Sequence, residues 1–220
     1  MLINTFICQT ATASENNSAD INTPWQLWRN KDEVKIEYRP VRQDQFIEIK
    51  ASTTIESSLS GFLLFIEDAN NIPNWLANAS SSQFLKKISA TENIFRTEFK
   101  GFWPIQTRDI IIHSKYRQNE DFSVDIFTLD AGDFQKPYAN IIRVELISGH
   151  WLIKPIYNAI PRVHVAYTFV VDAKGNIPLW LNKKLALKGI WETMQNIKQQ
   201  LPKSAWQTKK HIAIKEPTYG

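Results

Sequence analysis

The chain has 220 residues, of which 43% are hydrophobic and 22% charged, and a formal net charge of +4, which is ordinary for one globular domain. Its basic residues are scattered rather than clustered, which argues against a nucleic-acid partner, and no apolar run is long enough to form a transmembrane helix. The only cysteine, Cys8, excludes an intrachain disulfide and a cysteine-rich metal site.

The N-terminal segment has features of a signal peptide. Residues 1–8 are apolar, and Ala11-Thr12-Ala13 has the small-x-small form of a cleavage site. The apolar run is short and has no positive charge before it, so residues 1–13 are either the remnant of a signal peptide or a disordered leader; we favour the remnant. A remnant predicts a periplasmic or secreted protein, and a leader predicts a cytoplasmic one. Residues 1–22 are therefore set apart as remnant and linker.

The first elements are predicted from caps and alternation. Thr23 and Pro24 resemble a helix cap and first turn, so we expect a short helix over residues 25–28. Residues 34–38 and 46–55 alternate between apolar and polar, which predicts two half-buried strands joined as a hairpin.

A helix and several strands follow. Ser57 and Ser58 can cap the helix, which we expect to end near Asn70 because the residue before Pro73 disfavours helical geometry. Four strands are then predicted, over residues 82–88, 93–100, 109–117 and 122–129.

Residues 138–153 are predicted to form one long strand whose apolar phase changes between Leu146 and Trp151. A bulge at Ser148-Gly149 would repair the phase. Residues 162–172 are the last predicted strand.

A long helix completes the predicted domain. Pro178 opens this helix, which runs to about Leu201, and Gly189 interrupts it either as a site of close approach or as a tolerated imperfection. Strands and helices do not alternate, so we expect an α+β fold with a helix laid across a curved antiparallel sheet and an apolar cavity between them. Residues 203–220 are predicted to be a loosely ordered basic tail.

The order of these segments resembles the START domain of the helix-grip lipid-binding superfamily over about residues 24–201. The resemblance is carried by VKIEYRPV, FIEIKASTTI, NNIPNWLAN, FWPIQTRDIIIHSK, SGHWLIKP and GNIPLWLNKKLALKGIWETMQNIKQQL. It implies a domain over residues 23–202, with a curved sheet that grips the C-terminal helix and a lipid or sterol between them. The chain looks most like single-domain bacterial members, many of which are exported.

Arg108 is the leading candidate for a polar ligand contact. Alternation along a strand places it on one face with Ile110, Ile112 and Ser114, whereas Asp109 falls on the face that looks wetter. An arginine aimed at an apolar interior needs an anion. Arg108 therefore either anchors a ligand head group or forms a salt bridge that pins a strand.

The other candidates are apolar. Aromatic side chains either line a cavity or fill a core, and Leu181 and Leu185 form a stripe of the final helix that continues to Gly189. The predicted ligand-binding residues are Trp103, Arg108, Ile112, Trp151, Tyr167, Leu181 and Leu185.

No metalloprotease, nucleophile-elbow, P-loop or dinucleotide-binding motif is present, and the four histidines are far apart in sequence. We expect a non-catalytic monomer without cofactor or metal, which binds a lipid-like small molecule for transport or sensing and contacts membranes transiently. One alternative is a cyclase or aromatase on the same fold, which needs a polar, titratable cavity. Another is an interaction protein that binds no ligand, which needs a filled interior.

Overall fold

The computed structural model describes residues 23–101, 105–156 and 159–218. The helices are α1 (Leu59–Glu67), α2 (Ile72–Trp75) and α3 (Leu179–Gln200), and three short 3-10 helices are η1 (Gly132–Phe134), η2 (Leu201–Lys203) and η3 (Ala205–Thr208). The strands are β1 (Gln26–Lys31), β2 (Val34–Val41), β3 (Phe46–Glu56), β4 (Ala79–Lys87), β5 (Glu92–Phe99), β6 (Arg108–Gln118), β7 (Val124–Asp130), β8 (Ile142–Arg143), β9 (Glu145–Ile156) and β10 (Arg162–Asp172).

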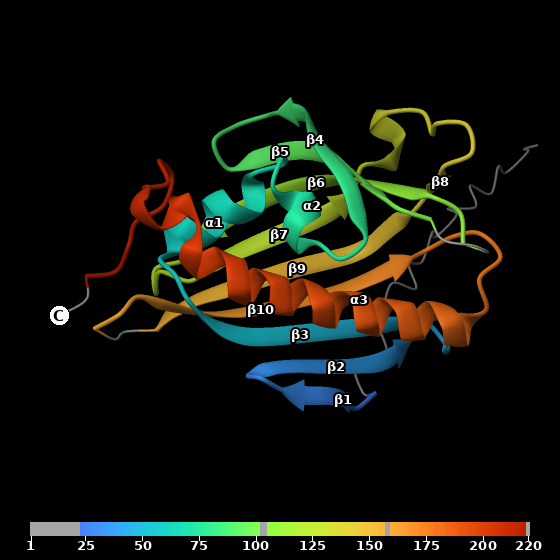
Figure 1. Cartoon of the computed structure of the whole chain (residues 1–220), viewed down its shortest axis with the longest axis horizontal. Coiled ribbons are helices and arrows are strands. Elements are labelled where there is room, and N and C mark those ends of the chain that lie inside the picture. Colours follow the sequence, from blue (N-terminus) through green and yellow to red (C-terminus); the bar gives the residue numbers. More distant parts are fainter. Residues whose placement is uncertain (1–22, 102–104, 157–158, 219–220) are drawn as a thin grey trace, which may run out of the picture.

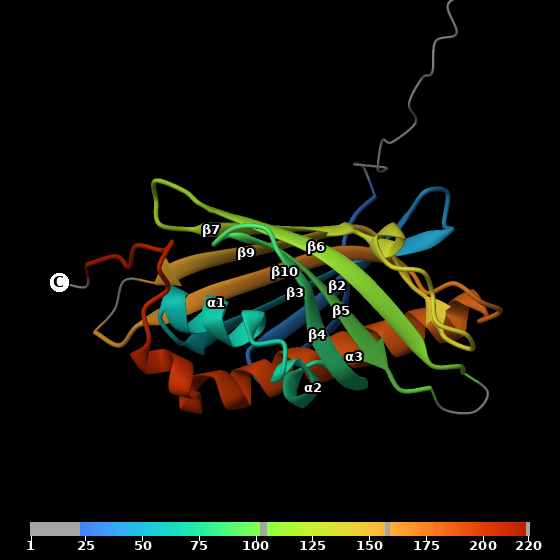
Figure 2. The same cartoon turned by 90° about the horizontal axis from the view of Figure 1, so that it is seen from above.

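The strands of the described residues form one open, curved sheet in the order β1-β2-β3-β10-β9-β7-β6-β5-β4. Neighbours along this order are antiparallel, and the short β8 pairs parallel with β6. All three α-helices lie on one face of the sheet, with α3 running across β3 and β10 (Figures 1 and 2). The predicted helix-grip architecture is confirmed.

The hairpin and first long helix form largely as the sequence predicts. Ile49, Ala51 and Ile55 of β3 are buried, in agreement with the alternation. The Ser58 side chain caps α1 by accepting a hydrogen bond from the Gly61 N–H at 2.9 Å. The helix ends at Glu67, earlier than expected, and the chain restarts as α2 with a proline in its first turn.

The helix predicted over residues 25–28 is wrong, because this segment belongs to strand β1. It pairs antiparallel with β2 at the edge of the sheet. There Trp28 packs edge-on against Trp191 of α3, and the Arg29 guanidinium lies over both indole rings. Sheet pairing and these aromatic contacts outweigh the local cap signal.

The long strand predicted over residues 138–153 is interrupted. It begins as the short β8 and continues as β9 after one residue, so only its second part has the predicted form. The expected bulge is present one residue earlier than predicted: Val170 pairs with Ser148 and Val171 with Leu146, which leaves Ile147 as the extra residue.

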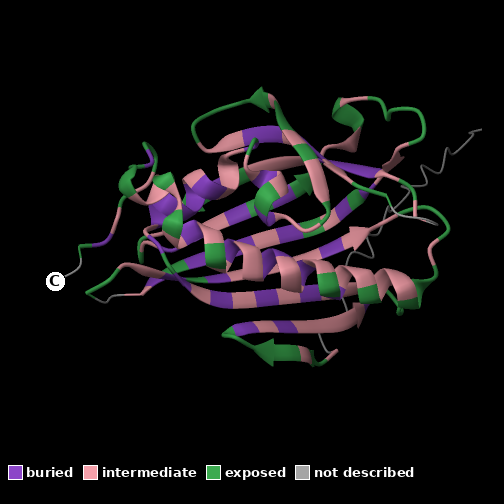
Figure 3. Cartoon of the chain, in the orientation of Figure 1, coloured by how far each residue is buried: buried purple, intermediate pink, exposed green. Residues whose placement is uncertain are grey.

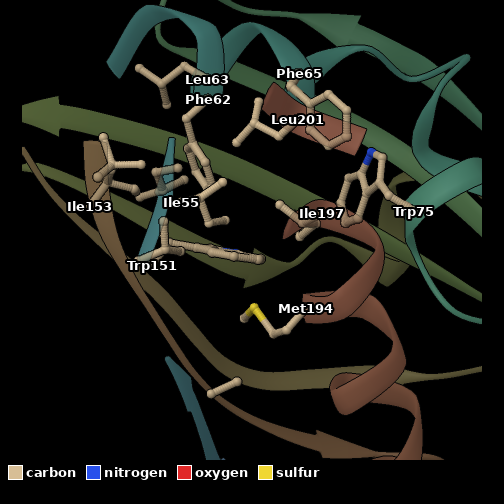
Figure 4. Close-up of a cluster of buried hydrophobic side chains, with 14 of the residues drawn as sticks. Ile55, Phe62, Leu63, Phe65, Trp75, Trp151, Ile153, Met194, Ile197 and Leu201 are labelled. Atoms are coloured by element: carbon tan, nitrogen blue, oxygen red, sulfur yellow. The ribbon is translucent and has the colours of Figure 1, made fainter. Parts of the chain in front are cut away.

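The core lies between the sheet, α1 and the C-terminal half of α3. The buried residues of α3 are Leu187, Ile190, Thr193, Met194 and Ile197 (Figure 3, purple). Phe62 of α1 packs on Trp151 of β9 with ring centroids 6.0 Å apart, and Met194 of α3 lies nearby (Figure 4). Each large side chain buried here contributes roughly 1.5–3 kcal/mol. This end of the sheet is therefore the rigid base on which the rest of α3 is held.

The tail is not a loose appendage over residues 203–218. His211 is buried against Tyr116, and Glu216 accepts hydrogen bonds from the backbone N–H groups of Leu59 and Ser60 at 3.1 and 2.7 Å. Gln207 donates to the Ser57 hydroxyl. The segment therefore closes the N-terminal end of α1, although the domain boundary at residue 202 stays a prediction. The predicted signal-peptide remnant lies outside the described residues.

Candidate ligand-binding site

Two adjoining cavities lie between the sheet and α3. The outer cavity has a volume of about 310 Å³ and lies under the N-terminal two thirds of α3. The inner cavity has a volume of about 120 Å³ and lies between α1, α2 and the strands β5, β6, β7 and β9. Five side chains line both cavities: Leu76, Ile112, Tyr167, Ile190 and Thr193. The cavities therefore share a wall and follow one another under the helix.

Strand β6 runs along both cavities. Its residues Arg108 and Ile110 line the outer cavity, Ile112 lies at the junction, and Ser114 and Tyr116 line the inner cavity. These residues alternate along the strand and so share the face that looks toward the helices. The predicted face of Arg108 is confirmed.

The outer cavity is apolar with a positively charged end. Most of its lining is aliphatic or aromatic, its cations are Arg108 and Lys100, and no acidic side chain is among its described lining residues. Gly189 of α3 lines this cavity with backbone alone, and a Cβ added there would meet no atom within 4 Å. The cavity can therefore take an apolar body and favours an anionic group.

Arg108 is buried, at 9% exposure, without an ionic partner in the described part of the chain. Its guanidinium donates to the backbone carbonyls of Gln106 at 2.7 Å, Ala173 at 3.2 Å and Lys174 at 3.5 Å. Burial lowers the pKa of Arg108, and no neighbouring carboxylate opposes this effect. Arginine stays charged nevertheless, and it keeps two N–H donors beyond these three bonds.

Asp109 does not lie on a wet face, and that expectation is wrong. Its side chain is fully buried and accepts hydrogen bonds from Arg96 Nε and Arg143 Nε, each at 2.6 Å. Burial alone would raise the pKa of Asp109, but the two guanidinium groups hold it below its ordinary value. Arg143 also donates to the carbonyls of Gly132 and Gln135, so residues 131–143 cover this part of the outer face.

A stack of three aromatic side chains extends from the inner cavity to the outer one. Tyr167 stacks on Trp151 with centroids 4.0 Å apart and on Phe169 at 4.8 Å. Burial raises the pKa of Tyr167, and the neighbouring Thr128 hydroxyl opposes that rise. The Tyr167 phenol is therefore neutral at physiological pH.

The inner cavity carries one carboxylate. Glu67 lies 3.3 Å from the His211 Nε2 and receives a bond of 3.5 Å from the Asn93 amide. The Tyr116 hydroxyl donates to the Ala90 carbonyl at 2.7 Å, and burial followed by the charge of Glu67 raises the pKa of Tyr116. The two cavities therefore differ in charge.

The predicted site residues are only partly brought together. Arg108 and Leu185 line the outer cavity, Trp151 lines the inner one, and Ile112 and Tyr167 line both. Leu181 is half-buried but lies outside both linings, and Trp103 lies outside the described residues.

Sequence reasoning missed the polar residues of the inner cavity. Asn93 pairs with Ser114, Ser114 with Thr128, and Thr128 with Gly149, so these four residues form one row across β5, β6, β7 and β9. A Cβ at Gly149 would collide with the Thr128 hydroxyl, so glycine at this position lets that hydroxyl keep its place. The row depends on strand register, which no local sequence pattern reveals.

Among the described residues, no three metal-binding side chains gather into a cluster. No histidine is among the described residues that line either cavity. None of the described helices combines the length and apolarity needed to cross a membrane.

Solved structures of lipid transfer proteins share this architecture. A fragment of a STAR-related lipid transfer protein from Xanthomonas axonopodis superposes with a TM-score of 0.70 at 20% identity, covering 80% of this chain and 98% of that one. Human StAR-related lipid transfer protein 5 gives a TM-score of 0.73 at 14% identity, covering 81% and 86%. Human STARD10 gives 0.71 at 16% identity, covering 81% and 73%.

No protein-family model and no curated protein sequence matches the chain. The structural likeness therefore defines the fold: the chain has the helix-grip fold of the START domain.

Proposed function

We propose that the protein binds a hydrophobic small molecule between the sheet and α3, for transport or sensing, without catalysing a reaction. The observation that carries this proposal is the pair of adjoining, mostly apolar cavities under α3. Apolar ligand surface that leaves water there contributes about 25 cal/mol per Å². The structural neighbours that are named as lipid transfer proteins support the same class of ligand.

Arg108 would hold the polar head of this ligand. A buried guanidinium that is oriented by carbonyls and lacks a carboxylate partner in the described residues is a suitable partner for a carboxylate or phosphate. The carbonyls of Ala173 and Lys174 belong to the loop before α3, so the same side chain also fixes that loop. Ligand exchange would then require the loop and the N-terminal part of α3 to move away from the sheet.

The beginning of α3 would provide the contact with a membrane. Leu179 and Trp180 are exposed there, at 49% and 67%, and Lys184 lies beside them on the surface. Exposed apolar side chains next to a lysine are suited to an anionic bilayer surface. Binding to phosphatidylserine vesicles should weaken in Trp180→Ser, and equal binding of both proteins would exclude this contact.

The competing functions have less support. A cyclase or aromatase needs an acid or base beside its substrate, whereas the described lining of the larger, outer cavity contains no histidine, aspartate or glutamate. An interaction protein without ligand needs a filled interior, and the cavities argue against it.

Gly189 offers a test that separates binding from folding. Gly189→Leu adds a side chain in the open space of the outer cavity and replaces a poor helix former, so the free energy of unfolding should rise by up to about 1 kcal/mol. The amount of lipid that co-purifies with the protein should fall, as measured by extraction and mass spectrometry.

The matched control is Gln199→Leu, which places the same side chain on an exposed position of the same helix, away from both cavities and from Trp180. It should leave the lipid content unchanged. Wild-type protein that carries no lipid and shows no thermal shift with fatty acids, sterols or phospholipids would contradict the proposed function.

A further inference from the structure

The inner cavity contains hydrogen-bonding groups whose partners are missing from the described residues. The Thr128 hydroxyl and the Asn93 side-chain oxygen are both buried, and neither forms a hydrogen bond of good geometry within the described residues, although the Tyr167 phenol lies close to the Thr128 hydroxyl. A buried polar atom without a partner costs about 1–3 kcal/mol. Two such atoms in the lining of one cavity indicate a site that is built for a polar group of the ligand.

These groups lie in one row of the sheet. Asn93, Ser114 and Thr128 occupy facing positions on β5, β6 and β7, and strands in a sheet lie about 4.8 Å apart. The row continues to Gly149, which leaves room for the Thr128 hydroxyl. On one side it is bordered by the apolar row of Ile126 and Trp151. A short polar band therefore crosses an apolar floor.

The charge of the inner cavity selects a neutral group. Glu67 is the acidic side chain of its lining, and the lining includes no lysine or arginine among the described residues. An anion would be repelled there, whereas the outer cavity offers Arg108 and Lys100 without an acidic side chain. A hydroxyl or carbonyl group can donate to or accept from the polar row without carrying charge.

The distance between Arg108 and the polar row can be estimated along β6, which carries a residue of each site. Arg108 and Ser114 lie on the same face of this strand six residues apart, which corresponds to about 20 Å at 3.3 Å per residue. The lining between them, Ile110 and Ile112 on this strand, is apolar.

We infer that the ligand has two polar ends: an acid group held by Arg108, and a neutral hydroxyl or carbonyl held by the row of Asn93, Ser114 and Thr128. A long apolar chain or ring system joins them. This inference rests on the proposed function and specifies the ligand class of the same site. An ω-hydroxylated long-chain acid is the simplest molecule of this kind.

The test compares plain saturated acids with their ω-hydroxy forms, from dodecanoic to octadecanoic acid, in a displacement assay on delipidated protein. The hydroxyl should tighten binding about threefold to tenfold, and only in chains long enough to reach the inner row. Thr128→Val should bring the ratio of the two affinities close to one. Because the ratio is compared, a general weakening of binding by the variant cancels.

Thr53→Val is the matched control. Thr53 also has a buried hydroxyl without a partner in the described residues, but it lines neither cavity, so its variant should keep the wild-type ratio. If plain acids bind and the hydroxyl gives no gain at any chain length, the inference is overturned while the proposed function stands. If neither the acids nor hexadecanol bind, both are overturned.

Discussion

Two neighbouring residues of β6 carry buried charges, but only one of them is paired with opposite charges of the protein. Asp109, on the outer face, is enclosed by Arg96 and Arg143 and has its charge neutralised by the protein itself. Arg108, on the inner face, meets only backbone carbonyls in the described part of the chain and lines a cavity. A buried charge paired inside the protein serves the fold, whereas one left without an opposite charge is available for a ligand.

The largest effect on this comparison is expected from Asp109→Asn, which leaves the buried Arg143 guanidinium without its anion and leaves Arg96 with only the partly exposed Glu98. We expect the free energy of unfolding to fall by about 3–5 kcal/mol, measured by urea denaturation. Asp172→Asn is the control, because Asp172 is partly exposed and pairs with Lys174 at the surface. A loss no larger than that of the control would show that the Asp109 cluster is not structural.

Acidification should remove the same contribution in the wild-type protein. The pKa of Asp109 is lower in the folded state than its ordinary 3.8, so folding favours the charged form. Its contribution is complete above about pH 4 and is lost as the pH falls through the folded-state pKa. Urea midpoints measured between neutral pH and pH 3 should therefore fall less steeply in Asp109→Asn than in wild type, and parallel curves would contradict the assignment.

Arg108→Met should behave differently from the Asp109 variant. Removal of the buried charge offsets the lost bonds to carbonyls, so stability should change by about 1 kcal/mol or less. Hexadecanoic acid should bind about tenfold or more weakly, because a charged hydrogen bond is lost. Hexadecanol, measured in the same displacement assay, should lose much less. A stability loss as large as that of Asp109→Asn would make Arg108 a structural residue.

The smallest effect is expected at the exposed side of the Asp109 cluster. Glu98 pairs with Arg96 at 3.0 Å, but its side chain is 29% exposed. Glu98→Gln should lower the free energy of unfolding by about 0.2–1 kcal/mol, and by less at high salt. A larger loss would mean that Glu98 shares the structural role of Asp109.

Alternation along the strands predicted much of this from the sequence. It placed Arg108, Ile112 and Ser114 on one face and identified β3 and β10 nearly residue for residue, and the helical spacing behind Pro178 did the same for α3. These elements are long and strongly periodic, and local patterns suffice for them.

Local sequence patterns could not predict the contacts between segments that are distant in the sequence. Asp109 is buried because Arg96 and Arg143, from two other parts of the chain, converge on it. The polar row of the inner cavity exists because three strands pair in one register. The strand β1 forms because its backbone pairs with β2 and its Trp28 packs on Trp191. Each of these depends on the tertiary fold, which overrides local propensity.

The packing of residues 203–218 bears on how this protein can be shortened. The carboxylate of Glu216 caps the backbone N–H groups at the start of α1, although Glu216 is far from that helix in the sequence. Removal of the residues after 202, where sequence likeness alone would place the end of the domain, would take this cap away from α1. It would also expose to solvent the hydrophobic core beside that helix. A fusion partner should therefore be attached before β1 rather than in place of the residues that follow α3.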